Sequence, residues 1–352
     1  MLINKKYWKN LRLGIFLFIC YNRGDMYQHV TSFYMERRDV MVKKEEFYYE
    51  SRDAIHKIRA MKWIPDTDDI LCVFQITHGM AEHIERYDEF AAFLAQRGIL
   101  VVANDHLGHG KSATDKADFG YFCEKDAATV VVRDVHRLKK IIQEQNPGKP
   151  YFILGHSMGS FIFRNYLCRY GKGIDGAIIM GTGTMPTAVI KVLMILTNII
   201  AMFRGWKHPS QMIDTMAFGN YNSRIKEPRT KSDWLSKDEA IVDMYIEDEA
   251  CGFPFTLNGF HTMAKLIDNL RKKDYLDKMP KDLPVLFVSG AEDPVGGYGE
   301  GVKEVYAQFE KLGMQNISMK LYENDRHEIL NENDRQDVFQ DIFEWITKQL
   351  GN

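Results

Sequence analysis

The spacing of hydrophobic residues changes along the chain between the period of a strand and that of a helix. Near the start, residues 45–50 and 56–63 predict two antiparallel strands joined by a turn at 51–54. Further on, short apolar runs predict strands and longer periodic stretches predict helices. The expected strands are 70–77, 99–104, 151–155 and 176–181, and the expected helices are 84–96 and 126–145. Because strand alternates with helix, we expect an α/β fold: a mostly parallel central sheet with helices on both faces.

This alternation stops between residues 184 and 279, where the sequence is helix-like and contains no good core strand. An insertion between two core strands, on the carboxyl side of the sheet, predicts a helical cap on a core made of 41–183 and 280–352. Within it, residues 189–203 are strongly apolar and rich in Met, Ile and Leu. That run is short for a transmembrane helix and too apolar for a solvated surface helix. Two interpretations remain open, a helix packed in the core and the lining of an acyl-chain channel, which flexible Met side chains suit.

Composition and charge are those of an ordinary soluble globular protein. Of 352 residues, 45% are hydrophobic and 27% are charged, and the formal net charge is −2. The length allows one large domain or two small ones. We expect no nucleic-acid partner, because the chain lacks a basic field. Five scattered cysteines without a CxxC pair predict buried free thiols in a reducing compartment, which favours a cytoplasmic location.

The first 40 residues form an unusual extension. Basic residues precede a short apolar run at 13–21, as in the charged and apolar regions of a signal sequence. This run has about half the length needed to span a bilayer, and no small-residue cleavage site follows it. Three interpretations remain open. The translation start could have been placed too far upstream, with the true start at a later methionine such as Met41; the other two are a weak membrane-surface anchor and a signal sequence.

A serine at a predicted strand-to-helix turn is the strongest chemical signal. The segment Gly155-His-Ser-Met-Gly159 follows the apolar strand at 151–155 and precedes a periodic apolar run that begins at Phe161. This is the pattern of the nucleophile elbow of serine hydrolases, in which glycines let strand and helix approach and leave the serine exposed. The pattern alone is common, so its context has to support it.

The other members of a catalytic triad follow in the expected order. A β-rich run at 284–290 ends in a turn that carries Asp293, and the strand that begins at Ile317 is followed by a polar loop that carries His327. In this arrangement His327 removes the proton of Ser157, and Asp293 orients the imidazole and stabilises its charged form. Other nearby carboxylates remain as alternatives for the acid: Glu292, Asp325 and Asp282.

An oxyanion hole requires two backbone N–H donors near the nucleophile. One donor is expected from Met158, directly after the serine, and the other from Met80 in the loop at 77–83. Residues around this loop, the elbow and the apolar cap helix are candidates for substrate contacts. These candidates are His78, Gly79, His156, Met185, Ile190 and Leu193.

The segment 104–112 has partial features of a phosphate-binding loop and of a metal site. Gly110-Lys-Ser resembles the end of a phosphate-binding loop, but Asp105 occupies the position of its first glycine. His106 and His109 lack the remaining ligands of a zinc site. We therefore expect no metal and no cofactor, and a structural role for this loop beneath the site.

Taken together, three motifs resemble the monoacylglycerol lipase and lysophospholipase group of α/β-hydrolases, which is often placed with the serine aminopeptidases. They are His78-Gly-Met-Ala-Glu-His83, Asp105-His-Leu-Gly-His-Gly-Lys-Ser112 and Gly155-His-Ser-Met-Gly159. The segments 233–238 and 245–256 also resemble the group's cap, and the similarity runs from about residue 45 to the end. This resemblance implies a cofactor-free esterase with an apolar cap, the triad Ser157, Asp293 and His327, and Met80 and Met158 as oxyanion donors. Members often carry a small residue where Met80 stands.

The leading hypothesis is therefore a serine hydrolase that cleaves esters of medium or long acyl chains, such as monoacylglycerol or lysophospholipid. Its partner is a small-molecule lipid or ester, with possible peripheral membrane contact through the cap or the N-terminal extension. One alternative is an aminopeptidase of the proline iminopeptidase type, which needs carboxylates near the site to hold the substrate's amine; Glu247, Asp248 and Glu249 are candidates. Another is a non-catalytic lipid-binding module.

Overall fold

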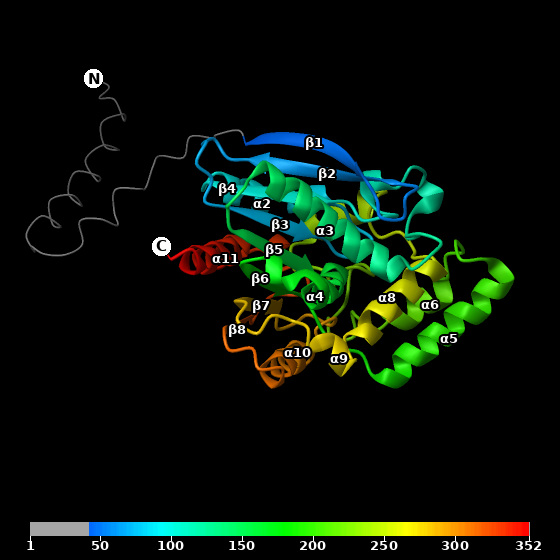
Figure 1. The fold of residues 1–352 in the computed structure, drawn as a ribbon. Helices are drawn as coiled ribbons and strands as arrows, with labels where there is room; N and C mark the ends of the chain where they lie inside the picture. Colours follow the sequence, from blue (N-terminus) through cyan, green and yellow to red (C-terminus); the bar gives the residue numbers. More distant parts are fainter. Residues whose placement is uncertain (1–41, 352) are drawn as a thin grey trace, which may run out of the picture. The chain divides into compact units, whose positions relative to one another are not determined.

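A computed structural model describes residues 42–351, and the expected N-terminal features at 1–40 lie outside these described residues. Its centre is one eight-stranded sheet, in which β1 and β2 form an antiparallel hairpin and the strands from β4 to β8 run parallel (Figure 1). In spatial order the strands are β1 (Lys43–Glu50), β2 (Lys57–Ile64), β4 (Ile99–Asn104), β3 (Cys72–Thr77), β5 (Tyr151–His156), β6 (Gly176–Met180), β7 (Val285–Gly290) and β8 (Ile317–Tyr322). The expected α/β fold is confirmed.

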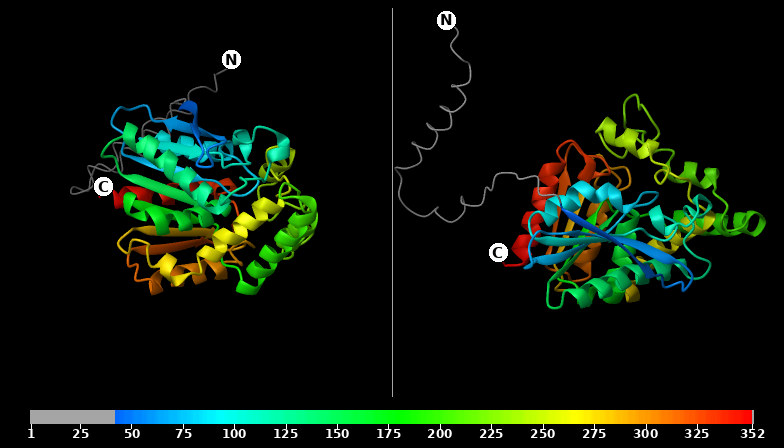
Figure 2. Two further views of the ribbon diagram at one scale, coloured as in Figure 1. Left: turned by 45° about the vertical axis from the view of Figure 1, so that its right-hand side comes forward. Right: turned by 90° about the horizontal axis from the view of Figure 1, so that it is seen from above.

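Helices cover both faces of the sheet. One face packs against α2 and α11, and the other packs against α3, α4, α8 and α10 (Figures 1 and 2). The bounds of these helices are α2 (Asp88–Ala95), α3 (Ala127–Gln145), α4 (Met158–Tyr170), α8 (Leu257–Asn269), α10 (Glu300–Lys311) and α11 (Arg335–Gln349). The central strands β3, β4 and β5 are buried along their whole length, as their continuous apolar sequences require.

One expected helix begins later than its periodicity predicts. Residues 84–96 were expected to form a single helix, but Ile84–Tyr87 form a 3-10 turn before α2 begins at Asp88. The Asp105 carboxylate accepts the Ile84 N–H at 3.0 Å, while Tyr87 is turned inward. These tertiary contacts hold the turn at the start of the helix.

The segment between β6 and β7 contains only helices and loops, apart from one isolated bridge between Pro209 and Thr256. Besides α8, its helices are α5 (Thr187–Arg204), α6 (Gln211–Phe218), α7 (Glu239–Glu247) and α9 (Lys273–Leu276). Figure 2 shows α5 lying along α8 at the outside of the molecule. Because α8 itself packs on α3 and α4, it belongs to the helix layer of the core, and the exact bounds of the predicted cap remain a prediction.

Four of the cysteines lie in the described part of the chain, and all four are buried free thiols. The fifth, Cys20, lies outside it. Burial raises the pKa of the Cys72, Cys123 and Cys168 thiols to about 12, which keeps them protonated and unreactive.

Candidate active site

Ser157 lies on a tight turn between β5 and α4, with φ 53° and ψ −121°. This conformation is rare for a residue with a side chain, and strain of this kind collects at functional sites. Two glycines allow the turn. A methyl group on Gly155 would lie 2.7 Å from the Phe163 Cβ atom, and one on Gly159 would overlap the carbonyl oxygen of Thr77. The side chain of Ser157 remains partly exposed at the tip.

His327 and Asp293 meet beyond the ends of β8 and β7. The His327 Nδ1 atom lies 3.0 Å from Asp293 Oδ1, although its N–H is not aligned well enough for a hydrogen bond. Both side chains are buried. The carboxylate is held by the Val295 N–H at 2.8 Å and by the Ser289 hydroxyl at 3.2 Å. This geometry allows Asp293 to orient the imidazole.

The other carboxylates considered for this role have different neighbours. Glu292 pairs with Lys237 at the surface, at 2.7 Å, and Asp282 is exposed. Asp325 is buried, and burial together with the nearby Asp334 and Glu332 carboxylates raises its pKa to about 7. Of the four candidate acids, Asp293 is the one at ion-pair distance from His327.

Ser157 and His327 converge at the end of β6. The Ser157 N–H donates to the Met180 carbonyl at 3.0 Å, and a methyl group on the next residue, Gly181, would lie 3.2 Å from the His327 ring. Within residues 42–351 the Ser157 hydroxyl makes no hydrogen bond. Catalytic hydrogen bonds often close only when substrate is present.

Both expected oxyanion donors border the nucleophile. Met158 is the first residue of α4, so its N–H has no acceptor within the helix. The loop that carries Met80 passes beside the elbow, because a methyl group on Gly79 would lie 3.2 Å from the Ser157 Cβ atom. In the described part of the chain the Met80 N–H has no acceptor either. Two free donors near one serine are what an oxyanion hole requires.

A buried ionic network joins the Met80 loop to the His327 loop, and the sequence reasoning did not find it. Glu82 accepts hydrogen bonds from the Gly79 N–H at 2.5 Å and from the Tyr87 hydroxyl at 2.7 Å. Arg86 donates to Glu82 at 3.0 Å and makes a bidentate pair with Glu328 at 2.5 and 2.6 Å. Burial opposes the charge of Glu82, but His156 and Arg86 hold its pKa well below the usual range.

His78 and His156, predicted as substrate contacts, are engaged inside the protein. His78 Nε2 accepts the His106 N–H at 2.9 Å, and its Nδ1–H donates to the Gly79 carbonyl at 2.8 Å. Burial lowers the pKa of His78, so the neutral ring that these bonds require is favoured. The Nδ1 atom of His156 is 2.8 Å from the Tyr87 hydroxyl. Both rings therefore support loops of the site, and their contact with substrate, like that of Gly79, stays a prediction.

The contact of the apolar residues Met185, Ile190 and Leu193 with substrate stays a prediction. Ile190 is fully buried against the core, and Leu193 is half-buried against the same cluster. Met185 lines a cavity of about 330 Å³ whose lining does not include Ser157. Closer to the triad is Trp234, whose ring centroid lies 5.1 Å from that of His327. The segment after α6 thus covers the histidine.

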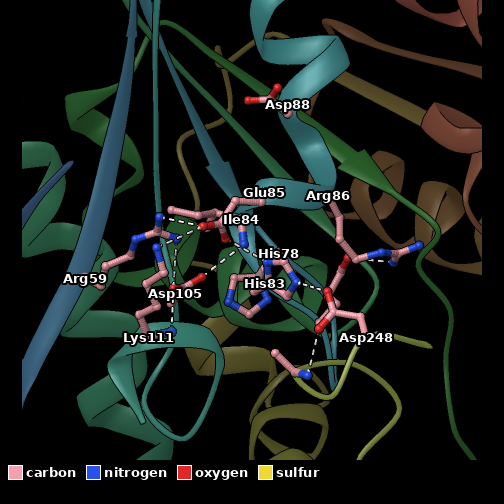
Figure 3. A network of polar contacts seen from close by, with 12 residues as sticks. Arg59, His78, His83, Ile84, Glu85, Arg86, Asp88, Asp105, Lys111 and Asp248 are labelled. Atoms are coloured by element: carbon pink, nitrogen blue, oxygen red, sulfur yellow. Dashed lines mark hydrogen bonds and ion pairs between the residues drawn. The ribbon is translucent and has the colours of Figure 1, made fainter. Parts of the chain in front are cut away.

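His83 links the Met80 loop to the segment after α7. Its Nδ1 lies 2.7 Å from Glu85 and its Nε2 lies 2.8 Å from Asp248 (Figure 3). Burial disfavours the charged ring, but hydrogen bonds with Cys251, Glu85 and Asp248 raise the pKa of His83 to about 11. Ligand atoms of His83, Asp248 and Cys251 lie within 4.8 Å of one another, as in some metal sites. A metal would have to displace this proton, so the ion pairs explain the cluster better.

Comparison with known proteins gives consistent matches. The profile of the serine aminopeptidase S33 family matches residues 70–334. A monoacylglycerol lipase of Mycolicibacterium smegmatis is 26% identical over 82% of this chain and 92% of its own, and a monoglyceride lipase of Rattus norvegicus is 27% identical over 82% and 86%. Among solved structures, a thermostable carboxyl esterase from Bacillus coagulans superposes with a TM-score of 0.81 at 32% identity, covering 87% of this chain and 99% of the esterase.

Proposed function

Since the chain belongs to the serine aminopeptidase S33 family and is a carboxylic ester hydrolase of the α/β-hydrolase fold, we propose that it hydrolyses monoacylglycerol or lysophospholipid at Ser157. The observation that carries the proposal is a strained serine beside two free N–H donors and a buried His327–Asp293 pair. That combination supplies a nucleophile, a base and an oxyanion site.

In the proposed mechanism, Ser157 Oγ attacks the ester carbonyl while His327 accepts its proton. The Met80 and Met158 N–H groups bind the oxygen that becomes negative, and Asp293 stabilises the imidazolium. His327 then gives the proton to the leaving alcohol, which leaves an acyl-enzyme. A water molecule activated by His327 releases the fatty acid and restores Ser157. None of these steps requires a cofactor.

The relatives support a lipid ester as the substrate class, since the chain resembles a monoacylglycerol lipase and a monoglyceride lipase over most of its length. The proposal includes both a glycerol and a phosphate-containing head group, and the turnover panel below distinguishes them. Acyl chains of medium or long length are favoured by the amount of apolar surface on the segment between β6 and β7.

We also propose that α5 contacts a membrane surface peripherally. Within residues 42–351 it is the one helix long and apolar enough to cross a bilayer, with mean hydropathy 1.7 and 17% of its residues buried. Its buried side packs against the rest of the protein. There the Thr197 hydroxyl lies 2.9 Å from the Nδ1 atom of His261 in α8. A helix that is tied down on one side and apolar on the other fits a membrane surface better than a membrane span. The buried free thiols support a proposed cytoplasmic location for the protein, with α5 at a membrane surface.

The aminopeptidase alternative is less well supported by the carboxylates it would need. Asp248 pairs with His83, and Glu249 pairs with Lys116 at the surface. Glu247 is exposed at the end of α7. Since two of these groups already have partners of opposite charge, an amine-binding role for them would require a rearrangement.

A turnover panel tests the proposal. It compares a long-chain monoacylglycerol, a lysophosphatidylcholine, a short acetyl ester and a prolyl arylamide. We expect the long-chain esters to be preferred, with kcat falling by about 10⁴-fold in Asp293→Asn and further in Ser157→Ala. Asp325→Asn is the matched control, because that carboxylate is also buried near His327 but is not its partner, and it should retain activity.

Hydrolysis of the arylamide alone would move the protein to the aminopeptidase class. Equal activity in Asp293→Asn and Asp325→Asn would remove Asp293 from the triad. Turnover that survives in Ser157→Ala would remove the proposed mechanism altogether.

A further inference from the structure

The cavity of about 330 Å³ that Met185 lines lies between α4, α8, α10 and the segment that follows β6. It is separate from the nucleophile, since Arg164 on its wall follows Ser157 by seven residues, about 10 Å along α4. Its volume is at the lower end of the range for small-ligand sites. The lining residues that carry the inference are Arg164, Arg271, Lys311, Gln308, Ile267 and Leu270.

The guanidinium of Arg164 is a buried cation without a carboxylate partner. It is 2% exposed, and in the described part of the chain no carboxylate lies within ion-pair distance of it. Its Nη1 donates to the Gly183 carbonyl at 3.1 Å and to the Thr182 hydroxyl at 3.3 Å, and its Nη2 donates to Gln308 at 3.3 Å, while Nε has no acceptor. Gly183 and Gln308 both line the cavity, which places the guanidinium on its wall.

A charge in this position is unusual. Buried arginines are normally paired with carboxylates, because removing a charge from water is energetically costly. Here burial lowers the pKa of Arg164 to about 10, an effect that Cys168 and Glu304 offset only in part. Arg164 is still protonated at neutral pH, so the cavity wall carries a positive charge that has no carboxylate at ion-pair distance.

The rest of the lining strengthens this charge. Arg271 and Lys311 are exposed residues on the same cavity, which therefore has three cations. Glu304 is its one lining carboxylate, and it already accepts a hydrogen bond from the Thr184 hydroxyl at 2.7 Å. An anion that entered the cavity would meet a net positive field.

The lining also has an apolar side, formed by Met185, Ile267 and Leu270. A free phosphate would leave this side without a partner. We propose that the cavity binds a small amphiphilic carboxylate, a medium-chain fatty acid, whose carboxylate pairs with Arg164 and whose tail lies against Ile267 and Leu270. Such an acid is of the kind that the proposed hydrolysis releases, so the inference extends that function, but its test requires no turnover.

Isothermal titration calorimetry of the full chain with octanoate tests the site. The decisive variant is Gln308→Glu, which places a carboxylate beside Arg164 Nη2 and so supplies the missing counter-ion within the protein. We expect octanoate affinity to fall at least tenfold, because the added carboxylate competes for the same cation. Gln315→Glu is the matched control: it makes the same change of charge at an exposed position outside the cavity, and affinity should be unchanged.

Two ligand controls complete the design. Octanol has the same tail without the charge, and inorganic phosphate has the charge without the tail; both should bind at least tenfold more weakly than octanoate. Melting temperatures of Gln308→Glu and Gln315→Glu show whether each variant is folded. Arg271→Gln, at an exposed position, should weaken octanoate several-fold.

Equal octanoate affinity in Gln308→Glu and Gln315→Glu would overturn the proposal, as would octanol or phosphate binding as tightly as octanoate. These outcomes leave the proposed esterase untouched, because neither variant alters Ser157, Asp293 or His327. Conversely, a failed turnover panel with intact octanoate binding would remove the proposed function and keep the site.

Discussion

Asp134 shows how one buried residue couples stability to pH. It lies in α3 and holds the turn of the β1–β2 hairpin, since its carboxylate accepts the Arg52 N–H at 2.6 Å and the Ser51 hydroxyl at 2.8 Å. Burial raises the pKa of Asp134 to about 7, and these two hydrogen bonds offset the effect only in part. The protonated form is thus favoured in the folded protein at mildly acidic pH.

This shift predicts that stability falls as pH rises from about 4 to about 7. In that range the unfolded chain releases the Asp134 proton while the folded protein retains it, so unfolding becomes more favourable. The loss amounts to about 2–4 kcal/mol once the pH exceeds the folded pKa. Asp134→Asn does not titrate: its amide oxygen can accept the Arg52 N–H, and its amide NH₂ can donate to the Ser51 hydroxyl. Urea unfolding should then show a smaller loss between about pH 5 and pH 8 than in the unchanged chain. If the unfolding free energies of Asp134→Asn and of the unchanged chain varied with pH in the same way, Asp134 would not be the group responsible.

At the scale of elements, α5 has two faces with different partners. Ile190, Thr197 and Ala201 are buried toward the core. The opposite face exposes large apolar side chains, of which Met202 and Phe203 are each 81% exposed. Exposed apolar side chains also occur on α6, at Met212 and Met216, and on α7, at Met244 and Ile246. An exposed apolar helix face such as that of α5 commonly marks a membrane or protein contact.

We therefore expect Met202→Ser/Phe203→Ser to reduce association with phospholipid vesicles by at least about tenfold, since burying one such side chain is worth about 1.5–3 kcal/mol. Unfolding free energy should change by less than about 0.5 kcal/mol, because both side chains are exposed. Vesicle flotation measures the association. Ile55→Ser, at a 72% exposed position in the β1–β2 turn, is the control and should bind as the unchanged chain does. Equal flotation of all three proteins would remove the membrane role of α5.

At the scale of the whole molecule, Arg86 connects parts of the chain that are distant in sequence. It pairs with Glu82 before α2 and with Glu328 after β8, and its guanidinium lies 4.8 Å from the ring of Tyr245 in α7. One largely buried cation thus contacts three segments: the loop that carries Met80, the loop that carries His327, and the segment between β6 and β7. Loss of this cation would leave Glu328 buried without a counter-ion.

Arg86→Met should accordingly lower the free energy of unfolding by about 3–5 kcal/mol. The double variant Arg86→Met/Glu328→Gln should recover part of that loss, because the unpaired charge is removed as well. Arg335→Met, which breaks partly exposed pairs with Glu89 and Asp238, should cost about 1 kcal/mol. Urea unfolding compares the three, and a cost for Arg86→Met no greater than that of the surface control would contradict a structural role for the network.

Features that depend on neighbours in the sequence could be predicted from the sequence. Every expected strand is present, because strand periodicity and the turns between strands are local properties. The position of Ser157 on a tight turn followed from Gly155 and Gly159, whose missing side chains the turn requires. The strand ends that carry Asp293 and His327 were also predictable, since the carboxyl ends of parallel strands share one edge of the sheet.

Features that depend on distant neighbours were decided by the tertiary structure. The sequence left four carboxylates as possible partners of His327, and the approach of β7 to β8 brings Asp293 to it. Periodicity alone could not say that α5 would turn much of its apolar surface outward, or that His78 and His156 would be held by internal hydrogen bonds. The lack of a carboxylate partner for Arg164 is likewise decided by residues distant in the sequence. The partners of a side chain, unlike its helix or strand, are set by residues far away in the chain that only folding brings together.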